Sequence, residues 1–455
     1  MEQLATGEPE WDLQFDENGN LTSPARGDFL AQVAGQGVQD LFMFSHGWGT
    51  AANDAQALYA TMFPLIQAAA HGASGLGKLG FAGIYWPSLW FPPTPATPPV
   101  QGESTQASAG PSAPLSAGTA AVTGADIAAS LAPGFADAAQ QATIIQLGQL
   151  IDDGQAMAEA GRTDEAKQGQ LAQISQLIQS LTPPAPPGGQ DEDCGETALL
   201  MTGDPAGDYQ KAAAVFGDMP ASDSTEGIGD WFTGALNGAK DALRVLSYWT
   251  MKTRAGTIGQ TGLGPLLSAL HAQSPGTRVH LIGHSFGARL VSFALAGIDA
   301  PADSPVGSLV LLQGAFSHWS FAGAAGNPFG GPGTLNTLGD RVHGPLAATF
   351  TPYDWAVGVW YPKASFLAGQ NLSDATVDPW GGMGADAFQP PGSAATVTMP
   401  AGGGMSYQFA PSTFYRVDAS SVINNTAGEP FSGAHSDIRK MPVAQLAAAA
   451  AAAHS

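Results

Sequence analysis

The chain has 455 residues, of which 38 are acidic and 16 basic, so its formal net charge is −22. This excess argues against a nucleic-acid partner, because phosphate binding needs clustered lysine and arginine. It also weakens attraction to an anionic membrane surface. The single cysteine, Cys194, excludes an intrachain disulfide and a thiolate-rich metal site. We expect no metal and no cofactor.

The N-terminal region alternates strand-like and helix-like segments. Trp11–Phe15 begins a hairpin whose turn is signalled by Asn18 and Gly19. The apolar run Gln39–Ser45 predicts a buried strand, a helix is expected from about Asn53 to Ala70, and Phe81–Trp86 predicts another buried strand. Strand, helix and strand in this order are typical of a parallel sheet.

The composition changes at Pro92. Prolines, serines and alanines dominate as far as Pro114, and a second proline-rich stretch covers Pro183–Pro187. Between them, apolar residues recur at helical spacing in two alanine- and glutamine-rich segments, at Ile144, Leu147 and Ile151 and again at Leu171, Ile174, Ile178 and Leu181. This pattern predicts a helical insertion with proline-rich linkers.

The core pattern resumes after the insertion. An alanine-rich stretch at Val443–Ala453 predicts a terminal helix. Strands are expected at Arg278–Gly283, Ser308–Leu312, Leu346–Phe350 and Thr413–Val417. The sequence therefore predicts an α/β class, with a core formed by residues 1–91 and 246–455. Residues 92–245 are expected to form an inserted helical lid or interaction region.

One motif stands between an apolar strand and a helix. Gly283-His-Ser-Phe-Gly287 has the form G-x-S-x-G, and its glycines allow a sharp turn that would hold Ser285 clear of the sheet. An ordinary strand-to-helix turn is the alternative interpretation. A catalytic serine also needs a base and a carboxylate that orients the base.

In this context the motif resembles the nucleophile turn of the α/β-hydrolase family. The resemblance implies a mostly parallel central sheet flanked by helices, and a triad in the chain order serine, acid, histidine. His435, beyond the last predicted strand, matches the family's base. Asp354, which directly follows the strand Leu346–Phe350, matches the acid, and Asp418 is the alternative. His318, His343 and His454 fit the base position less well.

A second signature precedes the serine motif. Phe44-Ser-His-Gly-Trp-Gly49 resembles the family's loop that helps to stabilise an oxyanion. The resemblance implies the backbone N–H groups of Trp48 and Phe286 as the oxyanion donors. His46 and Gly47 would support the loop, His46 as a structural residue rather than a proton carrier.

Several aromatic residues are expected near the strand ends on this edge. Trp86, Trp319 and Trp355 could line a substrate pocket, and Trp90 lies close by in the sequence. The alternative is that most of them are ordinary core residues. If they face the site, they favour an uncharged, apolar acyl group in a small-molecule or lipid-like ester.

The resemblance therefore predicts a serine hydrolase that cleaves carboxylic esters through an acyl-enzyme on Ser285. Lipase, thioesterase and amidase activities use the same apparatus and remain alternatives. A non-catalytic binding protein of the same fold, acting through residues 92–245, is another. Acyl chain length, physiological substrate and oligomeric state are not determined by the sequence.

The sequence also suggests a location. Its first residues lack the basic and apolar regions of a secretory signal. No window approaches the run of about eighteen apolar residues that a membrane-spanning helix needs. We expect a cytoplasmic protein with no integral membrane segment. Secretion without a leader remains open, as does the role of residues 92–245 as a mobile lid.

Overall fold

The structure is a computed structural model. It describes residues 2–3, 7–88, 123–135, 137–160, 162–181, 250–328, 331–360, 381–389, 394–402, 407–427 and 433–453. Trp90, Cys194, His454 and both proline-rich stretches lie outside these residues. The chain divides into two compact units. The first comprises Met1–Ser88, Lys252–Tyr361 and Asp374–Ser455, and the second comprises Leu89–Met251 and Pro362–Ser373.

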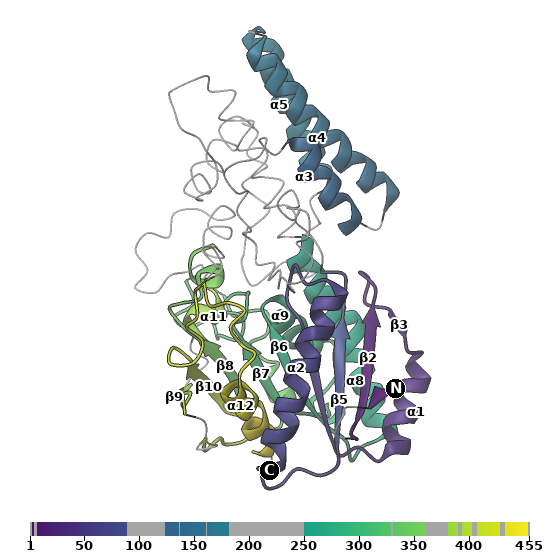
Figure 1. Cartoon of the computed structure of the whole chain (residues 1–455), viewed down its shortest axis with the longest axis vertical. Helices are drawn as coiled ribbons and strands as arrows, with labels where there is room; N and C mark the ends of the chain where they lie inside the picture. The colour runs from purple at the N-terminus through teal and green to yellow at the C-terminus, as the bar shows by residue number, and fades with distance from the viewer. Residues whose placement is uncertain are drawn as a thin grey trace, which may run out of the picture. The chain divides into compact units, whose positions relative to one another are not determined.

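A mixed but mostly parallel sheet of ten strands forms the centre of the first unit (Figure 1). Its order is β1-β2-β5-β4-β6-β7-β8-β10-β9, with β3 paired to β2. Among the described strands, only β1 and β3 run antiparallel to their neighbour β2. The strands are β1 (Glu2–Gln3), β2 (Pro9–Phe15), β3 (Leu21–Ser23), β4 (Asp40–Ser45), β5 (Leu79–Tyr85), β6 (Arg278–His284), β7 (Val306–Leu312), β8 (Leu346–Phe350), β9 (Ala395–Thr398) and β10 (Phe414–Asp418).

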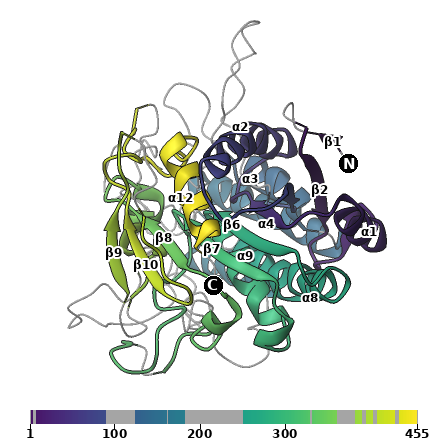
Figure 2. The ribbon, with the colours of Figure 1, turned by 90° about the horizontal axis from the view of Figure 1, so that it is seen from below.

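Helices cover both faces of this sheet, so the predicted α/β class is confirmed (Figure 2). The longer helices of this unit are α1 (Arg26–Gln36), α2 (Ala52–His71), α8 (Gly264–Gln273), α9 (Phe286–Ala294) and α12 (Met441–Ala452). Shorter elements are α11 (Met383–Asp386), the π-helices η3 (Ile258–Leu263) and η7 (Ala356–Trp360), and the 3₁₀ turns η4 (Leu295–Gly297), η5 (Pro301–Asp303) and η6 (Gly339–Arg341). Because both faces are covered, β4 and β7 are buried along their whole length and read as continuous apolar runs.

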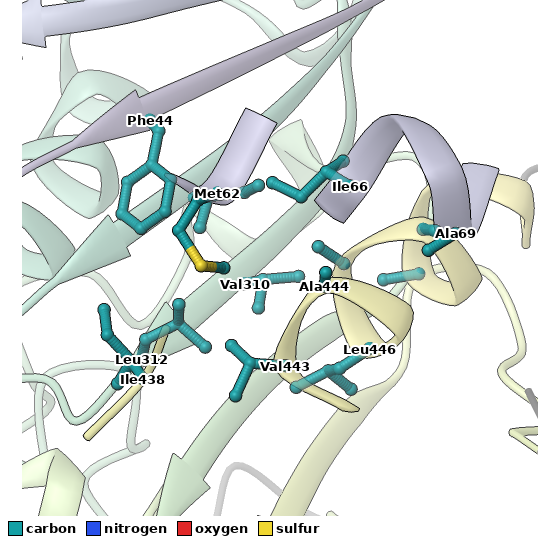
Figure 3. Close-up of a cluster of buried hydrophobic side chains, with 14 of the residues drawn as sticks. Phe44, Met62, Ile66, Ala69, Val310, Leu312, Ile438, Val443, Ala444 and Leu446 are labelled. Carbon is teal, nitrogen blue, oxygen red and sulfur yellow. The ribbon is translucent and has the colours of Figure 1, made fainter. Parts of the chain in front are cut away.

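Helices α2 and α12 pack together on one face, although more than 350 residues separate them in the chain. Figure 3 shows side chains from both helices meeting those of β4 and β7 in one apolar cluster. Ile438 belongs to the same cluster, and so does Ala434. The core therefore anchors the segment that leads into α12, which is the segment that carries His435.

The second unit contains a small group of helices. They are α3 (Gly124–Leu131), η1 (Ala132–Gly134), α4 (Ala138–Glu159) and α5 (Asp164–Leu181). The apolar positions that predicted helices 144–151 and 171–181 are buried. A side chain at Gly124 or Gly148 would collide with the other helix, so α3 and α4 approach closely. Across the described residues of both units, no helix is long and apolar enough to span a membrane.

A buried polar network ties the amino ends of the central strands together. The Asp40 carboxylate accepts hydrogen bonds from Arg278 Nε at 2.7 Å and Nη2 at 2.8 Å, and from His280 Nε2 at 3.1 Å. His280 Nδ1 in turn lies 3.0 Å from Ser308 Oγ. Burial opposes ionisation of Asp40, but the hydrogen bonds from His280, Arg278 and Gly77 outweigh it and lower the pKa of Asp40 to about 2.

Asp40→Asn is expected to destabilise the protein, because Arg278 and His280 lose the charge that compensates them. The expected loss is about 3 kcal/mol at pH 7, measured by urea unfolding. The folded-state pKa of Asp40 is depressed, so its contribution is complete above about pH 4 and is lost as the pH falls toward 2. The variant should therefore lose less stability than the wild type between pH 4 and 2.

Asp299→Asn removes an exposed carboxylate between η4 and β7 and is the matched control. It should leave the stability at pH 7, and the stability lost between pH 4 and 2, unchanged. Equal stability of Asp40→Asn and the wild type at pH 7 would contradict a stabilising role for this network.

Candidate active site

Ser285 occupies the turn between β6 and α9 in a strained conformation. Its backbone has φ 58° and ψ −126°, a region that residues other than glycine rarely adopt. The turn is held on both sides of the serine, since its N–H donates to Leu312 O at 3.1 Å and its carbonyl accepts from Ala315 N–H at 3.2 Å. The serine is 6% exposed. Strain maintained by the surrounding chain is a common feature of functional residues.

The two glycines of the motif are required by close approach. A side chain at Gly283 would collide with the backbone of Gly287 and Ala288 at the start of α9. A side chain at Gly287 would collide with the carbonyl oxygens of Ser45 and His46 at the end of β4. The G-x-S-x-G spacing therefore lets β4, β6 and α9 converge on Ser285.

Asp354 and His435 meet directly. His435 Nδ1 donates to Asp354 Oδ2 at 2.8 Å, and the two residues are 3% and 1% exposed. Their loops are joined by a short antiparallel bridge between Asp354 and Gly433, in which Ala434 N–H donates to Tyr353 O at 2.8 Å. Gly433 has φ 58°, and a side chain there would collide with Tyr353 O. The chain order predicts both residues beyond the carboxyl ends of the strands, and the backbone bridge sets how their loops align.

The Asp354 carboxylate has two further donors. Val357 N–H donates to Oδ1 at 3.0 Å, and Gln313 Nε2 donates to Oδ2 at 2.8 Å. Gln313 was not predicted as a site residue. Its only sequence signal is its position directly after β7, the strand between those that carry Ser285 and Asp354.

His284, the residue before Ser285, connects the serine turn with His435. Its Nε2 donates to the His435 carbonyl oxygen at 2.9 Å, and the two rings lie 4.8 Å apart. Burial, with a smaller effect from neighbouring His435, lowers the pKa of His284 to about 3. A neutral imidazole can therefore hold this bond throughout the neutral range. Ser285 and His435 themselves share no hydrogen bond in the described chain.

His46 braces the loop that follows β4. Its Nδ1 donates to Gly47 O at 2.9 Å, and its Nε2 accepts from Trp86 N–H at 3.3 Å. The Trp86 ring stacks on His46 at 5.5 Å, and its indole N–H donates to His46 O at 3.1 Å. Burial lowers the pKa of His46 to about 4. With both ring nitrogens engaged and the ring neutral, His46 has the contacts of a structural residue.

Gly47 places this loop directly against the serine. A Cβ at Gly47 would lie 2.6 Å from Ser285 Cβ and 3.2 Å from Ser285 Oγ. Next along the loop, the Trp48 ring packs against the Phe286 ring with 5.5 Å between centroids. Both side chains are buried, so the loop and the start of α9 form one packed wall beside Ser285.

The three tryptophans expected to line a pocket lie in different surroundings. Trp86 stacks on His46, Trp319 packs edge-on against His318 at 5.1 Å, and Trp355 lies beside Gly433. No ring contact joins them among the described residues. Trp86 and Trp355 thus border the segments that carry His46 and His435, whereas Trp319 packs with His318.

The alternative site residues have other partners. Asp418 Oδ1 accepts from Ser420 Oγ at 2.6 Å and from Ser420 N–H at 3.0 Å, and it does not contact His435. His343 Nε2 lies 3.0 Å from Ser304 O, and His318 Nδ1 lies 3.3 Å from Asp386 Oδ2. Of the candidates in the described chain, Asp354 is the carboxylate that pairs with His435.

Within the described residues, no group of three or more histidine, cysteine, aspartate or glutamate side chains is arranged to hold a metal ion. No known family model, curated protein or solved structure matches the chain. The site combines a strained serine, a buried carboxylate–imidazole pair and a loop that lies against the serine.

The depressed pKa of His284 predicts a pH dependence of stability. An unfolded chain protonates this histidine near pH 6.5, whereas the folded protein resists protonation, so its contribution is complete above about pH 6.5 and is lost as the pH falls toward 3. His284→Gln keeps an N–H donor but cannot titrate. On moving from pH 7 to 5, the wild type should lose about 2 kcal/mol more stability than this variant in urea unfolding.

His71→Gln, at an exposed position of α2, is the control and should match the wild type at both pH values. Identical losses in wild type and His284→Gln would show that His284 already titrates freely in the folded protein.

Proposed function

We propose that this protein is a serine hydrolase that cleaves carboxylic esters through an acyl-enzyme on Ser285. The observation that carries the proposal is the buried Asp354–His435 pair, held next to the strained Ser285 turn by the bond from His284 to His435 O. The chain order serine, aspartate, histidine and the strand positions of these residues support membership of the α/β-hydrolase family. A strained serine alone would not favour catalysis over a structural turn.

His435 is the proposed general base. Because a carboxylate can only accept hydrogen bonds, the Asp354 contact assigns the imidazole proton to Nδ1 and leaves Nε2 as the basic nitrogen. Nε2 takes the Ser285 proton as Oγ attacks the ester carbonyl carbon. Hydrogen bonds of this kind are often long before substrate binds, so a small adjustment of the hydroxyl or ring is expected in the substrate complex.

The remaining steps return the serine to its starting state. The tetrahedral intermediate collapses as its bond to the alcohol oxygen breaks, and His435 gives the proton to the departing alcohol. Water then attacks the acyl carbon while His435 accepts a proton from it, and Ser285 leaves with that proton. Asp354 stabilises the imidazolium in both halves and stays ionised.

The Trp48 and Phe286 N–H groups are the proposed oxyanion donors. Gly47 supports this assignment, since a Cβ at this position would lie only 3.2 Å from Ser285 Oγ, so a glycine lets the loop come this close to the serine. The Trp48 and Phe286 rings pack against each other and make the surroundings apolar. An uncharged acyl group in a small-molecule or lipid-like ester fits this chemistry. Thioester, amide and lipid substrates would follow the same steps and belong in the same assay panel.

Ser285→Ala is expected to reduce turnover of short p-nitrophenyl esters at least about 1,000-fold, because the acyl-enzyme can no longer form. The same variant should not be labelled by a fluorophosphonate probe, which phosphonylates an activated serine with loss of fluoride. Turnover is measured from p-nitrophenolate release, and labelling by mass spectrometry.

Ser308→Ala is a matched control. Ser308 also lies in a serine–histidine–aspartate chain, with His280 and Asp40, but that chain is fully buried at the other edge of the sheet. The Ser308→Ala variant should keep wild-type turnover and labelling. Undiminished turnover in Ser285→Ala would show that Ser285 is not the nucleophile. A wild type that neither turns over the panel nor reacts with the probe would leave a non-catalytic binding protein as the interpretation.

Gly47→Ala tests the oxyanion loop. The added methyl group would lie 2.6 Å from Ser285 Cβ, so the loop must move away from the serine. Since a displacement of about 1 Å in a catalytic group can cost about 100-fold, kcat/KM should fall by that order. Gly27→Ala in α1, where nothing lies within 4 Å of the new methyl group, should retain full activity. Equal activity in both variants would argue against the proposed loop.

A further inference from the structure

The side chain of Gln313 is fully buried against the Asp354 carboxylate. Its Nε2 donates two hydrogen bonds, to Asp354 Oδ2 at 2.8 Å and to Gly384 O at 3.1 Å. Asp354 Oδ2 is the oxygen that also accepts from His435. Gln313 and His435 thus bind the same carboxylate oxygen.

Thr349, on β8, holds the amide oxygen and the main chain of Gln313. Its hydroxyl donates to Gln313 Oε1 at 2.8 Å, while its oxygen accepts from the Gln313 main-chain N–H at 2.9 Å. Turning the amide over would point Oε1 at two acceptors, the Asp354 carboxylate and Gly384 O. The Gln313 amide therefore has one allowed orientation, in which its N–H group is directed at Asp354.

The backbone of Gln313, like that of Ser285, has a positive φ. Its φ is 48°, in the left-handed region that residues other than glycine seldom occupy. Such a conformation is unfavourable and persists only when surrounding contacts impose it. Here the two contacts with Thr349 hold the backbone in place, and the side chain reaches Asp354 from this position. The same conformation leads the chain from β7 into the loop in which Ala315 N–H donates to Ser285 O.

We infer that Gln313 is a positioning residue for the Asp354–His435 pair, and that Thr349 holds its amide in place. This inference rests on the proposed hydrolase function. Gln313 acts on the reaction through Asp354 and has no contact with the proposed reacting atoms. A glutamine confined to packing or to satisfying Gly384 O would affect stability but leave the chemistry of the pair unchanged.

Two effects on the chemistry follow. The Gln313 donor holds the carboxylate in the plane in which Oδ2 faces His435, so its removal lets the carboxylate rotate. It also withdraws negative charge from Oδ2, so its removal leaves that oxygen a stronger acceptor and stabilises the His435 imidazolium. The first effect lowers kcat. The second moves the acidic limb of the kcat/KM profile to higher pH, because more of the base is protonated at a given pH.

Gln313→Met keeps the length and flexibility of the side chain and removes its donors. We expect kcat for the best ester of the panel to fall about 10- to 100-fold, the value of one hydrogen bond to a buried charge, with KM little changed. The acidic limb of the kcat/KM profile should move to higher pH. Thr349→Val should change kcat and the acidic limb in the same direction but by less. Thr349→Ser keeps the hydroxyl and should have the wild-type values of both.

The double variant separates action through Gln313 from an independent effect. If Thr349 acts by orienting Gln313, Gln313→Met with Thr349→Val should have the kcat of Gln313→Met alone. Should Gln313→Met fail to fold, the Thr349→Val and Thr349→Ser pair still decides the question, because these variants keep Gln313 and differ only in the hydroxyl.

A spectroscopic readout distinguishes failure of this inference from failure of the proposed function. The low-field proton resonance of His435 Nδ1–H, identified by its absence in His435→Gln, reports the bond to Asp354 without any substrate. It should shift or broaden in Gln313→Met. A wild type without Ser285-dependent turnover would overturn the proposed function, while this resonance would still test the positioning. Wild-type kcat, acidic limb and resonance in Gln313→Met, with only a lower melting temperature, would overturn the inference.

Discussion

The buried charge of Asp354 constrains the carboxyl edge of the sheet more than any other group there. A carboxylate that is 1% exposed has lost its hydration, which costs several kcal/mol unless donors replace the water. Its donors come from three separate parts of the chain: Val357 in its own loop, Gln313 after β7, and His435 before α12. Satisfying this one charge therefore fixes how three loops sit at the ends of adjacent strands.

The same three residue types occur twice in this sheet, in opposite settings. Ser308, His280 and Asp40 form a continuous hydrogen-bonded chain at the amino ends of the strands, where all three are almost completely buried and Arg278 compensates the charge. At the carboxyl ends, Ser285 lies in a strained turn beside a backbone loop, and no arginine contacts the Asp354 carboxylate in the described chain. Side-chain identity is thus a weak guide to function. Backbone strain and position in the sheet distinguish the two groups.

Much of the fold could be predicted because burial on both faces leaves a strong pattern. The strands β4, β6, β7 and β8 appear as apolar runs, and each forms within two residues of its predicted bounds. The short edge strand β9 has no buried residue and left no such pattern. The order of Ser285, Asp354 and His435 was available from the resemblance to a known family, and the structure adds the direct contact between the last two.

The contacts around the pair could not be predicted in the same way. Gln313, Thr349 and Asp354 meet only because β7 and β8 are neighbours in a particular register. Both strands are buried on both faces, and such continuous apolar runs show no alternation from which a register could be predicted. His284 is read from sequence as the variable position of a motif, although its ring holds the main chain of His435, 151 residues away. Polar contacts between distant segments depend on the assembled fold.

The burial of His46 and His284 has a consequence for how charge changes at this edge. Both rings stay neutral well below pH 6, so no fixed positive charge from either accumulates beside His435 in the neutral range. Two of the three imidazoles gathered around the Ser285 turn are therefore neutral near pH 7. A second protonated imidazole would repel an imidazolium formed at His435, and the burial of His46 and His284 removes that repulsion from the neutral range.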